Sequence, residues 1–377
     1  MRGRRGGHHA WRLATLLAVA VVIAVVTTTG DVRVPPRLLV LIAGALAVSV
    51  ALVSTDRWLP VAAVAGALIA GGAAGHVLLS PGMPRVHDIV HLWGIWGYGR
   101  SIHDGVFYPL WIPYLGAGIP LFQFYGPLNF LLALPGILLE LSPVGAWKLE
   151  LYGGHVLSGL SMLTAARVLG AGWRGSLVAA TAFAFAPWRL ANFDYRGALG
   201  ESNAFLFMPL IAAATLRMAC DPRRRTAVTL GVSVGLLLLT HAVSLFTLMV
   251  ALVPAVVVGE IVARPSRQQL RLRMIRMMVP WIVALGVTAA WWVPVAAELR
   301  FTAVKAVTAD NPYFHYDQHG ISSSELVERR LWDQLRVSLP QSRREELGGR
   351  AQMPFYFGVP LVLLALAVPW WSDRSVG

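Results

Sequence analysis

The stretch 126-GPLNFLLALPGILLELSP-143 decides the fold, because its placement sets the orientation of every helix that follows it. It is apolar enough to cross a membrane, but it is short, contains three prolines and ends at Glu140. If it spans, nine arginines of the later loops face outward. If it lies in or partly enters the outer interface, the nine face the cytoplasm, where Lys and Arg normally collect. Among the short loops that follow, only Arg189 and Arg196 oppose this orientation. The nine arginines are Arg217, Arg223, Arg224, Arg225, Arg264, Arg267, Arg271, Arg273 and Arg276.

The composition of the whole chain indicates the same class of protein. Of its 377 residues, 56% are hydrophobic and 14% are charged, whereas about 25% are charged in a typical soluble domain. Apolar runs near the length of about 20 residues needed to cross a bilayer recur along it. The sequence therefore predicts an all-α, polytopic membrane protein. The net charge of +13 is explained by basic cytoplasmic loops, so no nucleic-acid partner is expected.

About ten transmembrane helices are predicted, with interfacial helices in the first large outer loop and with both termini in the cytoplasm. The basic N-terminus and the apolar run behind it are typical of a retained signal anchor. The predicted spans are 12–28, 37–54, 58–80, 147–168, 174–190, 203–219, 226–241, 243–262, 277–297 and 354–371, with a short turn at Thr240–His241. The regions are 1–80 with three transmembrane helices, 81–146 as the outer loop, 147–297 as a core of six helices, 298–353 as an outer polar segment, and 354–377 with the last helix and a short tail.

Ionisable residues collect in the predicted outer loop, in the stretch 84-PRVHDIVHLW-93. If 85–99 is helical, His87, Asp88 and His91 share one face. An aspartate near histidines can act as a general base or hold a divalent cation. The alternative is that Asp88 pairs with Arg85 or His91 and ties down the loop.

A second outer turn, 187-PWRLANFDYRGALGES-202, contains Asp194, Arg196 and Glu201. Its glycines would let the backbone approach a ligand closely, and Arg196 could bind a phosphate through its planar fork. The alternative is a turn between helices with an Arg–Glu pair. His241 lies in the next outer turn, where it either joins this group or caps the end of a span.

Several short blocks, in order, resemble one family of bacterial and archaeal membrane proteins. They are 107-FYPLWIPYLGAGIPLFQFYGPLNFLLALPGILLELSP-143, 195-YRGALGES-202, 236-LLLLTHAVS-244 and 289-AAWWVPVAAEL-299. The family is labelled the 6-pyruvoyl-tetrahydropterin synthase-related membrane proteins, and the resemblance covers roughly 85–371. That family in turn resembles the C-type (GT-C) glycosyltransferases, so a GT-C-like fold in a bacterial or archaeal plasma membrane is expected.

The resemblance implies a polyprenyl-phosphate sugar lipid as donor and transfer on the outer face. Asp88 would be the general base, Asp194 the second acid, and Arg196 or His241 would lie near the donor phosphate, with His87, His91 and Glu201 also binding substrate. Where the family has a second acid, this chain has His87, which argues against the family's metal at that position. A divalent metal on Asp88 and His91 stays an alternative, and protein partners are left open. The chain also ends earlier than the family's members. A lipid or polysaccharide transporter and a non-catalytic truncated relative are the other hypotheses.

Overall fold

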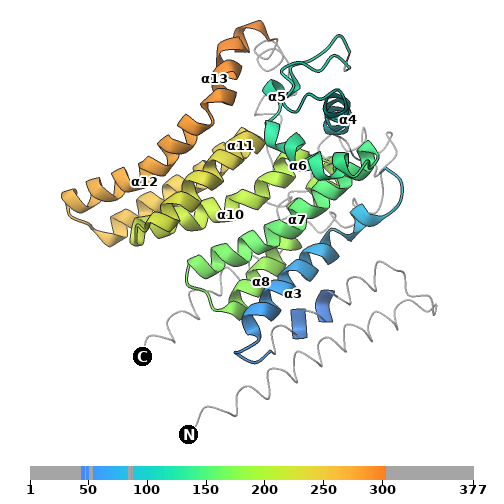
Figure 1. The fold of residues 1–377 in the computed structure, drawn as a ribbon. Coiled ribbons are helices and arrows are strands. Elements are labelled where there is room, and N and C mark those ends of the chain that lie inside the picture. Colours follow the sequence, from blue (N-terminus) through green and yellow to red (C-terminus); the bar gives the residue numbers. More distant parts are fainter. Residues whose placement is uncertain are drawn as a thin grey trace, which may run out of the picture.

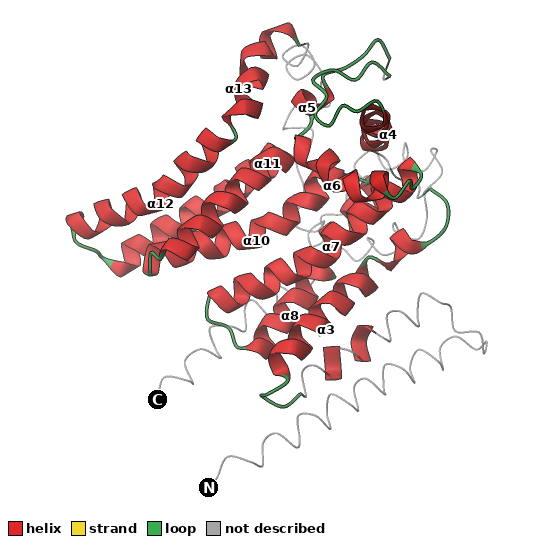
Figure 2. Ribbon diagram, in the orientation of Figure 1, coloured by secondary structure: helices red, strands yellow, loops and turns green. Residues whose placement is uncertain are grey.

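The computed structural model describes residues 44–46, 48–50, 54–83, 86, 88–114 and 116–302. The predicted spans 12–28 and 354–371 and nearly all of the predicted polar segment 298–353 lie outside these residues. Within them the chain is helical, and the only extended pairing is one isolated bridge between Ile112 and Ile119 (Figure 2). The prediction of an all-α protein is therefore confirmed for the described residues.

The helices follow one another with short connections (Figure 1). They are α3 (Leu59–Ala74), the 3-10 turn η1 (His76–Leu79), α4 (Val90–His103), α5 (Leu121–Phe124), α6 (Pro127–Leu138), α7 (Pro143–Val168), α8 (Trp173–Ala184), α9 (Pro187–Ala191), the π-helical turn η2 (Asn192–Arg196), α10 (Leu199–Cys220), α11 (Arg224–Ala263), α12 (Arg267–Val287), α13 (Ala289–Glu298) and the 3-10 turn η3 (Leu299–Phe301).

Two described helices, α10 and α11, are long and apolar enough to cross a membrane. The number rises to four if the bent pairs α6–α7 and α12–α13 each count as one span. The predicted span 174–190 is not one continuous helix. α8 has only 12 residues, and a new helix begins at Pro187, because a proline disfavours helical geometry in the residue before it. α3, with 16 residues, is also shorter than its predicted span.

The stretch that begins at Gly126 forms α6, and α6 is bent by 118° from α7. Its 12 residues rise about 18 Å, well short of the roughly 30 Å hydrocarbon core of a bilayer. This geometry favours a helix that lies in or partly enters the interface over a complete span.

The 40-residue helix α11 is broken at His241, whose backbone is extended (φ −155°, ψ 90°). Gly231 lies against Pro280, and Gly235 lies against Ala284 and Thr288, so the first arm of α11 runs parallel to α12. Near the end of the second arm, Glu260 pairs with Arg273 of α12 at 3.1 Å across the short α11–α12 connection, so the second arm runs antiparallel to α12. The second arm is thus antiparallel to the first, and the predicted break at Thr240–His241 is confirmed.

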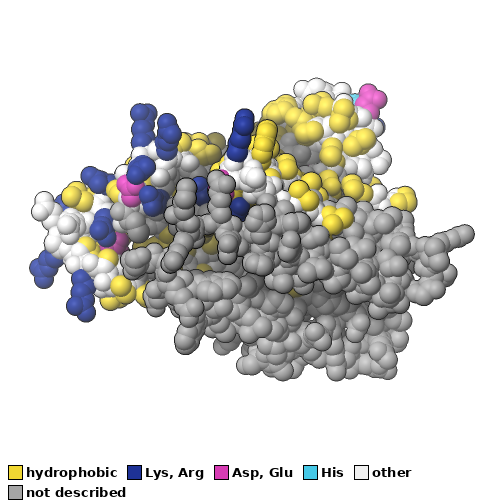
Figure 3. Space-filling view, turned by 90° about the horizontal axis from the view of Figure 1, so that it is seen from below, with side chains coloured by type: hydrophobic (Ala, Val, Ile, Leu, Met, Phe, Trp, Pro, Cys, Tyr) yellow, Lys and Arg dark blue, Asp and Glu magenta, His cyan; other side chains and the backbone are white. Residues whose placement is uncertain are grey.

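The basic residues and the break at His241 lie at opposite ends of the same helices. Arg217 is near the end of α10, and the arginines of the α10–α11 and α11–α12 connections lie beside it. Figure 3 shows the Lys and Arg side chains gathered at this end of the molecule. Many apolar side chains on the outer faces of α11 and α12 are exposed, including Val250, Ile261 and Val287. Exposed apolar helix faces with basic residues gathered at one end of the helices are typical of a membrane protein.

Candidate functional site

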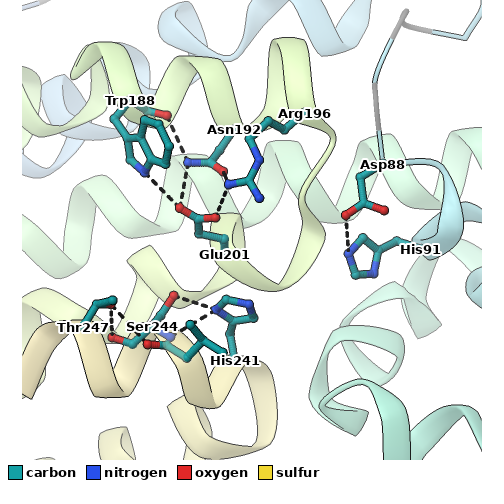
Figure 4. Close-up of polar contacts among 10 residues, drawn as sticks. Asp88, His91, Trp188, Asn192, Arg196, Glu201, His241, Ser244 and Thr247 are labelled. Carbon is teal, nitrogen blue, oxygen red and sulfur yellow. Dashed lines mark hydrogen bonds and ion pairs between the residues drawn. The ribbon is translucent and has the colours of Figure 1, made fainter. Parts of the chain in front are cut away.

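Asp88 and His91 form an acid–imidazole pair at the start of α4 (Figure 4). Asp88 Oδ2 lies 3.5 Å from His91 Nε2. The His91 side chain is buried in the first turn of α4 and meets the Tyr125 ring edge-on at 4.9 Å. α4 begins at Val90, so Asp88 precedes the helix, contrary to the prediction of a helix over 85–99. His87 lies outside the described residues.

The backbone of Asp88 ties this pair to a distant part of the chain. Its N–H donates to the carbonyl of Arg196, at 2.7 Å. Burial raises the pKa of the Asp88 carboxyl, but the hydrogen bond and charge of His91, the backbone N–H of Val90 and the charge of Arg196 outweigh it, and the net pKa lies below the ordinary value. Asp88 is therefore ionised at neutral pH and faces a buried imidazole.

Arg196 and Glu201 form an ion pair through Arg196 Nη1. Trp188 Nε1 donates to Glu201 Oε1 at 2.9 Å, and Asn192 accepts from Arg196 Nη1 at 3.0 Å. The predicted alternative, a turn with an Arg–Glu pair, is confirmed. The hydrogen bonds of the Arg196 side chain to Asn192 and Glu201 both involve Nη1, and Nε and Nη2 form the other edge of the guanidinium fork.

The two glycines of this turn lie in close contact with neighbouring side chains. Gly197 has a left-handed backbone (φ 69°), and a Cβ there would lie 2.8 Å from Val86 Cβ. A Cβ on Gly200 would lie 3.1 Å from Cδ2 of the His241 ring. Gly197 thus packs the turn under the segment before α4, and Gly200 brings α10 against the break in α11.

His241 caps the second arm of α11. The break leaves the N–H of Ser244 without its helical acceptor, and this N–H donates to His241 Nδ1 at 3.2 Å. The predicted capping alternative is therefore confirmed. Because Nδ1 is the acceptor, the neutral ring carries its proton on Nε2. Figure 4 shows the free edge of this ring turned toward the space between Arg196 and His91.

A buried network behind His241 was missed by the sequence analysis. The carbonyl of Thr240, also freed by the break, accepts from Asn129 Nδ2 at 2.8 Å. Asn203 Nδ2 donates to Asn129 Oδ1 at 3.2 Å and to Glu150 Oε1 at 2.6 Å. The network thus joins α6, α7 and α10 to the break. The signal in the sequence was the polar character of Asn129, Glu150 and Asn203 within apolar helices, where a polar side chain is costly unless it is paired.

Removing the amide at the centre of this network is expected to weaken the fold. Asn129→Ala leaves the Thr240 carbonyl buried without a donor, at a cost of about 2 kcal/mol. The measurement is chemical unfolding of the purified protein in detergent. Gln269→Ala is the control, because Gln269 belongs to an exposed capping box and its loss costs roughly 0.5 kcal/mol. Equal unfolding midpoints for the two variants would contradict the role of Asn129.

Arg189 lies in a second, separate cluster. Its side chain is buried, and it donates to the Phe183 carbonyl at 2.7 Å, to His155 Nδ1 at 3.0 Å and to Ser158 Oγ. Its guanidinium also lies 4.1 Å from the centre of the Phe183 ring. Arg189 therefore holds α7, α8 and α9 together. Asp194 has its backbone in η2, and its side chain lies outside what the structure describes.

The described residues do not fit a metal centre. Asp88 and His91 could supply two ligands, but no group of three His, Cys, Asp or Glu side chains able to hold a metal ion occurs in the described part of the chain. A divalent ion usually needs more protein ligands than this pair offers. The chemistry of the site is therefore argued from its acid, imidazole and guanidinium groups.

Comparisons with protein-family models, curated proteins and solved structures gave no match. The interpretation of the site consequently depends on its own residues and geometry. Three stretches far apart in the sequence contribute Asp88 and His91, Arg196 and Glu201, and His241 to one site.

Proposed function

We propose that the protein is a membrane glycosyltransferase of the GT-C type, which transfers a sugar from a polyprenyl-phosphate donor to an acceptor hydroxyl. The observation that carries this proposal is that an ionised carboxylate, Asp88, faces the same space as the side chains of Arg196 and His241 (Figure 4), and that the charge of Arg196 acts on this carboxylate. A general base beside two phosphate-binding groups is the arrangement that such a transfer needs. The short blocks that resemble GT-C-related proteins contain Arg196, Glu201 and His241.

The proposed reaction is an inverting displacement at the anomeric carbon. Asp88 removes the proton of the acceptor hydroxyl as its oxygen bonds to that carbon, and the bond from the carbon to the phosphate oxygen breaks with its electron pair on the phosphate. Arg196 Nε and Nη2 and the His241 Nε2–H would donate to this phosphate and stabilise its charge. Glu201 and Asn192 hold the guanidinium in place, and His91 holds Asp88.

The proposed topology places the site on the extracytoplasmic side of a bacterial or archaeal plasma membrane. The cluster of arginines at the opposite end supports this orientation, because basic residues favour the cytoplasm. In this proposal the fold has about ten transmembrane helices, both termini are cytoplasmic, and the helices of 81–146 lie near the outer interface.

The test is direct transfer by the purified full chain in lipid nanodiscs. Polyprenyl-phosphate sugars are supplied with hydroxyl acceptors, and both the glycosylated product and the released polyprenyl phosphate are measured. The two should appear in equal amounts. If the protein binds polyprenyl-phosphate sugars but releases no polyprenyl phosphate with any sugar of the panel, the proposal is contradicted.

The pH dependence of transfer follows from the lowered pKa of Asp88. The reaction needs the carboxylate, which is present above its pKa and lost as the pH falls through it. Since this pKa lies below about 3.9, the usual value for aspartate, Asp88 should impose no acidic limb between pH 5 and pH 7. The measurement is kcat/KM against pH for the wild type and Asp88→Glu. A wild-type limb near neutral pH that moves in the Asp88→Glu variant would show that Asp88 is not ionised as described.

A lipid or polysaccharide transporter is the second candidate, and two observations favour it. Transporters often use broken helices and buried ionisable side chains, and here α11 is broken at His241 while Glu150 and Arg189 are buried. If the protein is a transporter, cells that lack it should accumulate the lipid substrate in the inner leaflet. If it is a transferase, cells that lack it should accumulate the donor in the outer leaflet.

A further inference from the structure

A cleft between α4 and the turn from α6 to α7 is separate from the site described above. Its volume is about 380 Å³. Trp96, Arg100 and His103 of α4 line one side, and Ile137, Glu140 and Leu141 line the other, where α6 turns into α7. None of the proposed catalytic or phosphate-binding residues borders it.

The two sides of the cleft carry opposite charges. Arg100 and His103 are exposed and three residues apart on α4, so they share one face of the helix. Neither Arg100 nor Glu140 has an ion-pair partner among the described residues, and Arg100 lies over the Tyr114 ring at 5.7 Å. A cleft with a cationic side and an acidic side complements a zwitterion.

Glu140 occupies a backbone position that normally favours glycine. Its φ is +55°, directly after the end of α6. Its N–H donates to the Ile137 carbonyl at 3.0 Å, and the N–H of Leu141 donates to the Gly136 carbonyl at 3.0 Å. This is the Schellman pattern, in which glycine is usual because other residues are strained there. A strained acid at the rim of a cleft points to a role for its carboxylate.

The surroundings of the cleft point to a lipid in preference to a soluble molecule. Leu138 and Leu139, beside Glu140, are 64% and 67% exposed. On the other side Trp93 and Trp96 of α4 are exposed, as is typical of side chains at a membrane–water interface. A headgroup in the cleft would therefore have its acyl chains beside exposed leucines.

We propose that this cleft binds a phospholipid of the bilayer whose headgroup is a zwitterion with a primary amine, such as phosphatidylethanolamine. The phosphate would lie on Arg100 and His103, and the ammonium would donate to Glu140. Tryptophan and leucine side chains at the rim would cover the glycerol and the first methylenes. This lipid site does not depend on the sugar-transfer function.

Native mass spectrometry of the full chain tests the site. The detergent-purified protein is titrated with phosphatidylethanolamine, phosphatidylcholine or phosphatidylglycerol of identical acyl chains. We expect one phosphatidylethanolamine to bind roughly tenfold more tightly than either of the others, as expected for one added charge-assisted hydrogen bond. Equal retention of phosphatidylglycerol would overturn the proposal in favour of a general anion site. If soluble glycerophosphoethanolamine displaces the bound phosphatidylethanolamine at the same concentration as the lipid itself does, the assignment to a bilayer lipid is overturned.

Variants separate binding from folding. Arg100→Gln should weaken the binding of all three lipids, because each carries a phosphate, and Glu140→Gln should abolish the preference for the ethanolamine headgroup. Arg57→Gln should leave it unchanged, since Arg57 lies over the Trp58 ring at 5.6 Å and is remote from the cleft residues in the fold. Glu140→Gly relieves the backbone strain, so it should raise the unfolding temperature and still lose the preference. If Glu140→Gly keeps the wild-type lipid preference, Glu140 does not bind the amine.

Discussion

Asp88→Asn is expected to lower the rate of sugar transfer by about 10²- to 10⁴-fold, the usual contribution of a general base. The amide has nearly the same shape, but it cannot take the proton of the acceptor hydroxyl. The loss should appear in kcat, while the KM for the donor changes little, because the phosphate is bound by Arg196 and His241. The measurement is steady-state transfer by the purified variant with the donor and the acceptor varied in turn.

The matched control is Asp56→Asn, which removes an equally small acid from the far end of α3. Asp56 is almost fully exposed and lies 3.5 Å from Arg174, so its loss should leave kcat and KM unchanged. Both variants should unfold at nearly the wild-type temperature, because the Asp56 pair is exposed and such pairs contribute little to stability, and because Asn at position 88 can still accept a hydrogen bond from His91 through Oδ1. An Asp88→Asn protein that retains more than half of the wild-type kcat would contradict the assignment of Asp88 as the base.

Gly126→Ala is expected to produce the largest loss of stability in the described part of the chain. A Cβ at Gly126 would lie 2.3 Å from the Leu239 carbonyl oxygen and 2.5 Å from that of Thr240. These are backbone atoms at the break in α11, so they can move only if the break itself moves. We expect a loss of about 3 kcal/mol, measured by chemical unfolding in detergent, and a fall in donor binding because His241 shifts with the break.

Gly153→Ala is the control for this substitution. Gly153 lies inside α7, and a Cβ there would meet nothing within 4 Å, so the same change should stabilise the protein by roughly 0.5–1 kcal/mol through helix propensity. Opposite signs for the two variants would support the close packing of α6 on the break. A Gly126→Ala protein as stable as the wild type would show that α6 and α11 are further apart than described.

The features that depend on local pattern were predictable from the sequence. Hydropathy indicated an all-helical protein with helices apolar enough to cross a membrane, and the polar pair Thr240–His241 inside an apolar run indicated the break in α11. The broken span 174–190 could also have been foreseen, because Pro187 lies within it. Its apolar composition concealed this signal.

The features that depend on tertiary contacts were not predictable. The hydrogen bond between Asn129 and Thr240 joins residues 111 positions apart, and no local pattern specifies such a pairing. The same holds for Glu150 and Asn203, whose polarity was visible but whose partners were not. Gly197 and Gly200 were noticed as points of close approach, yet only packing identifies what approaches them, namely Val86 and the His241 ring.

An experimental structure of the full chain in a lipid nanodisc with polyprenyl phosphate bound would test the proposed phosphate site directly. We predict that the phosphate contacts the Nε–Nη2 edge of Arg196 and Nε2 of His241, with the Asp88 carboxylate facing the same space. A phosphate bound at the opposite end of the bundle, among Arg217 and the arginines of the α10–α11 and α11–α12 connections, would contradict the proposed site.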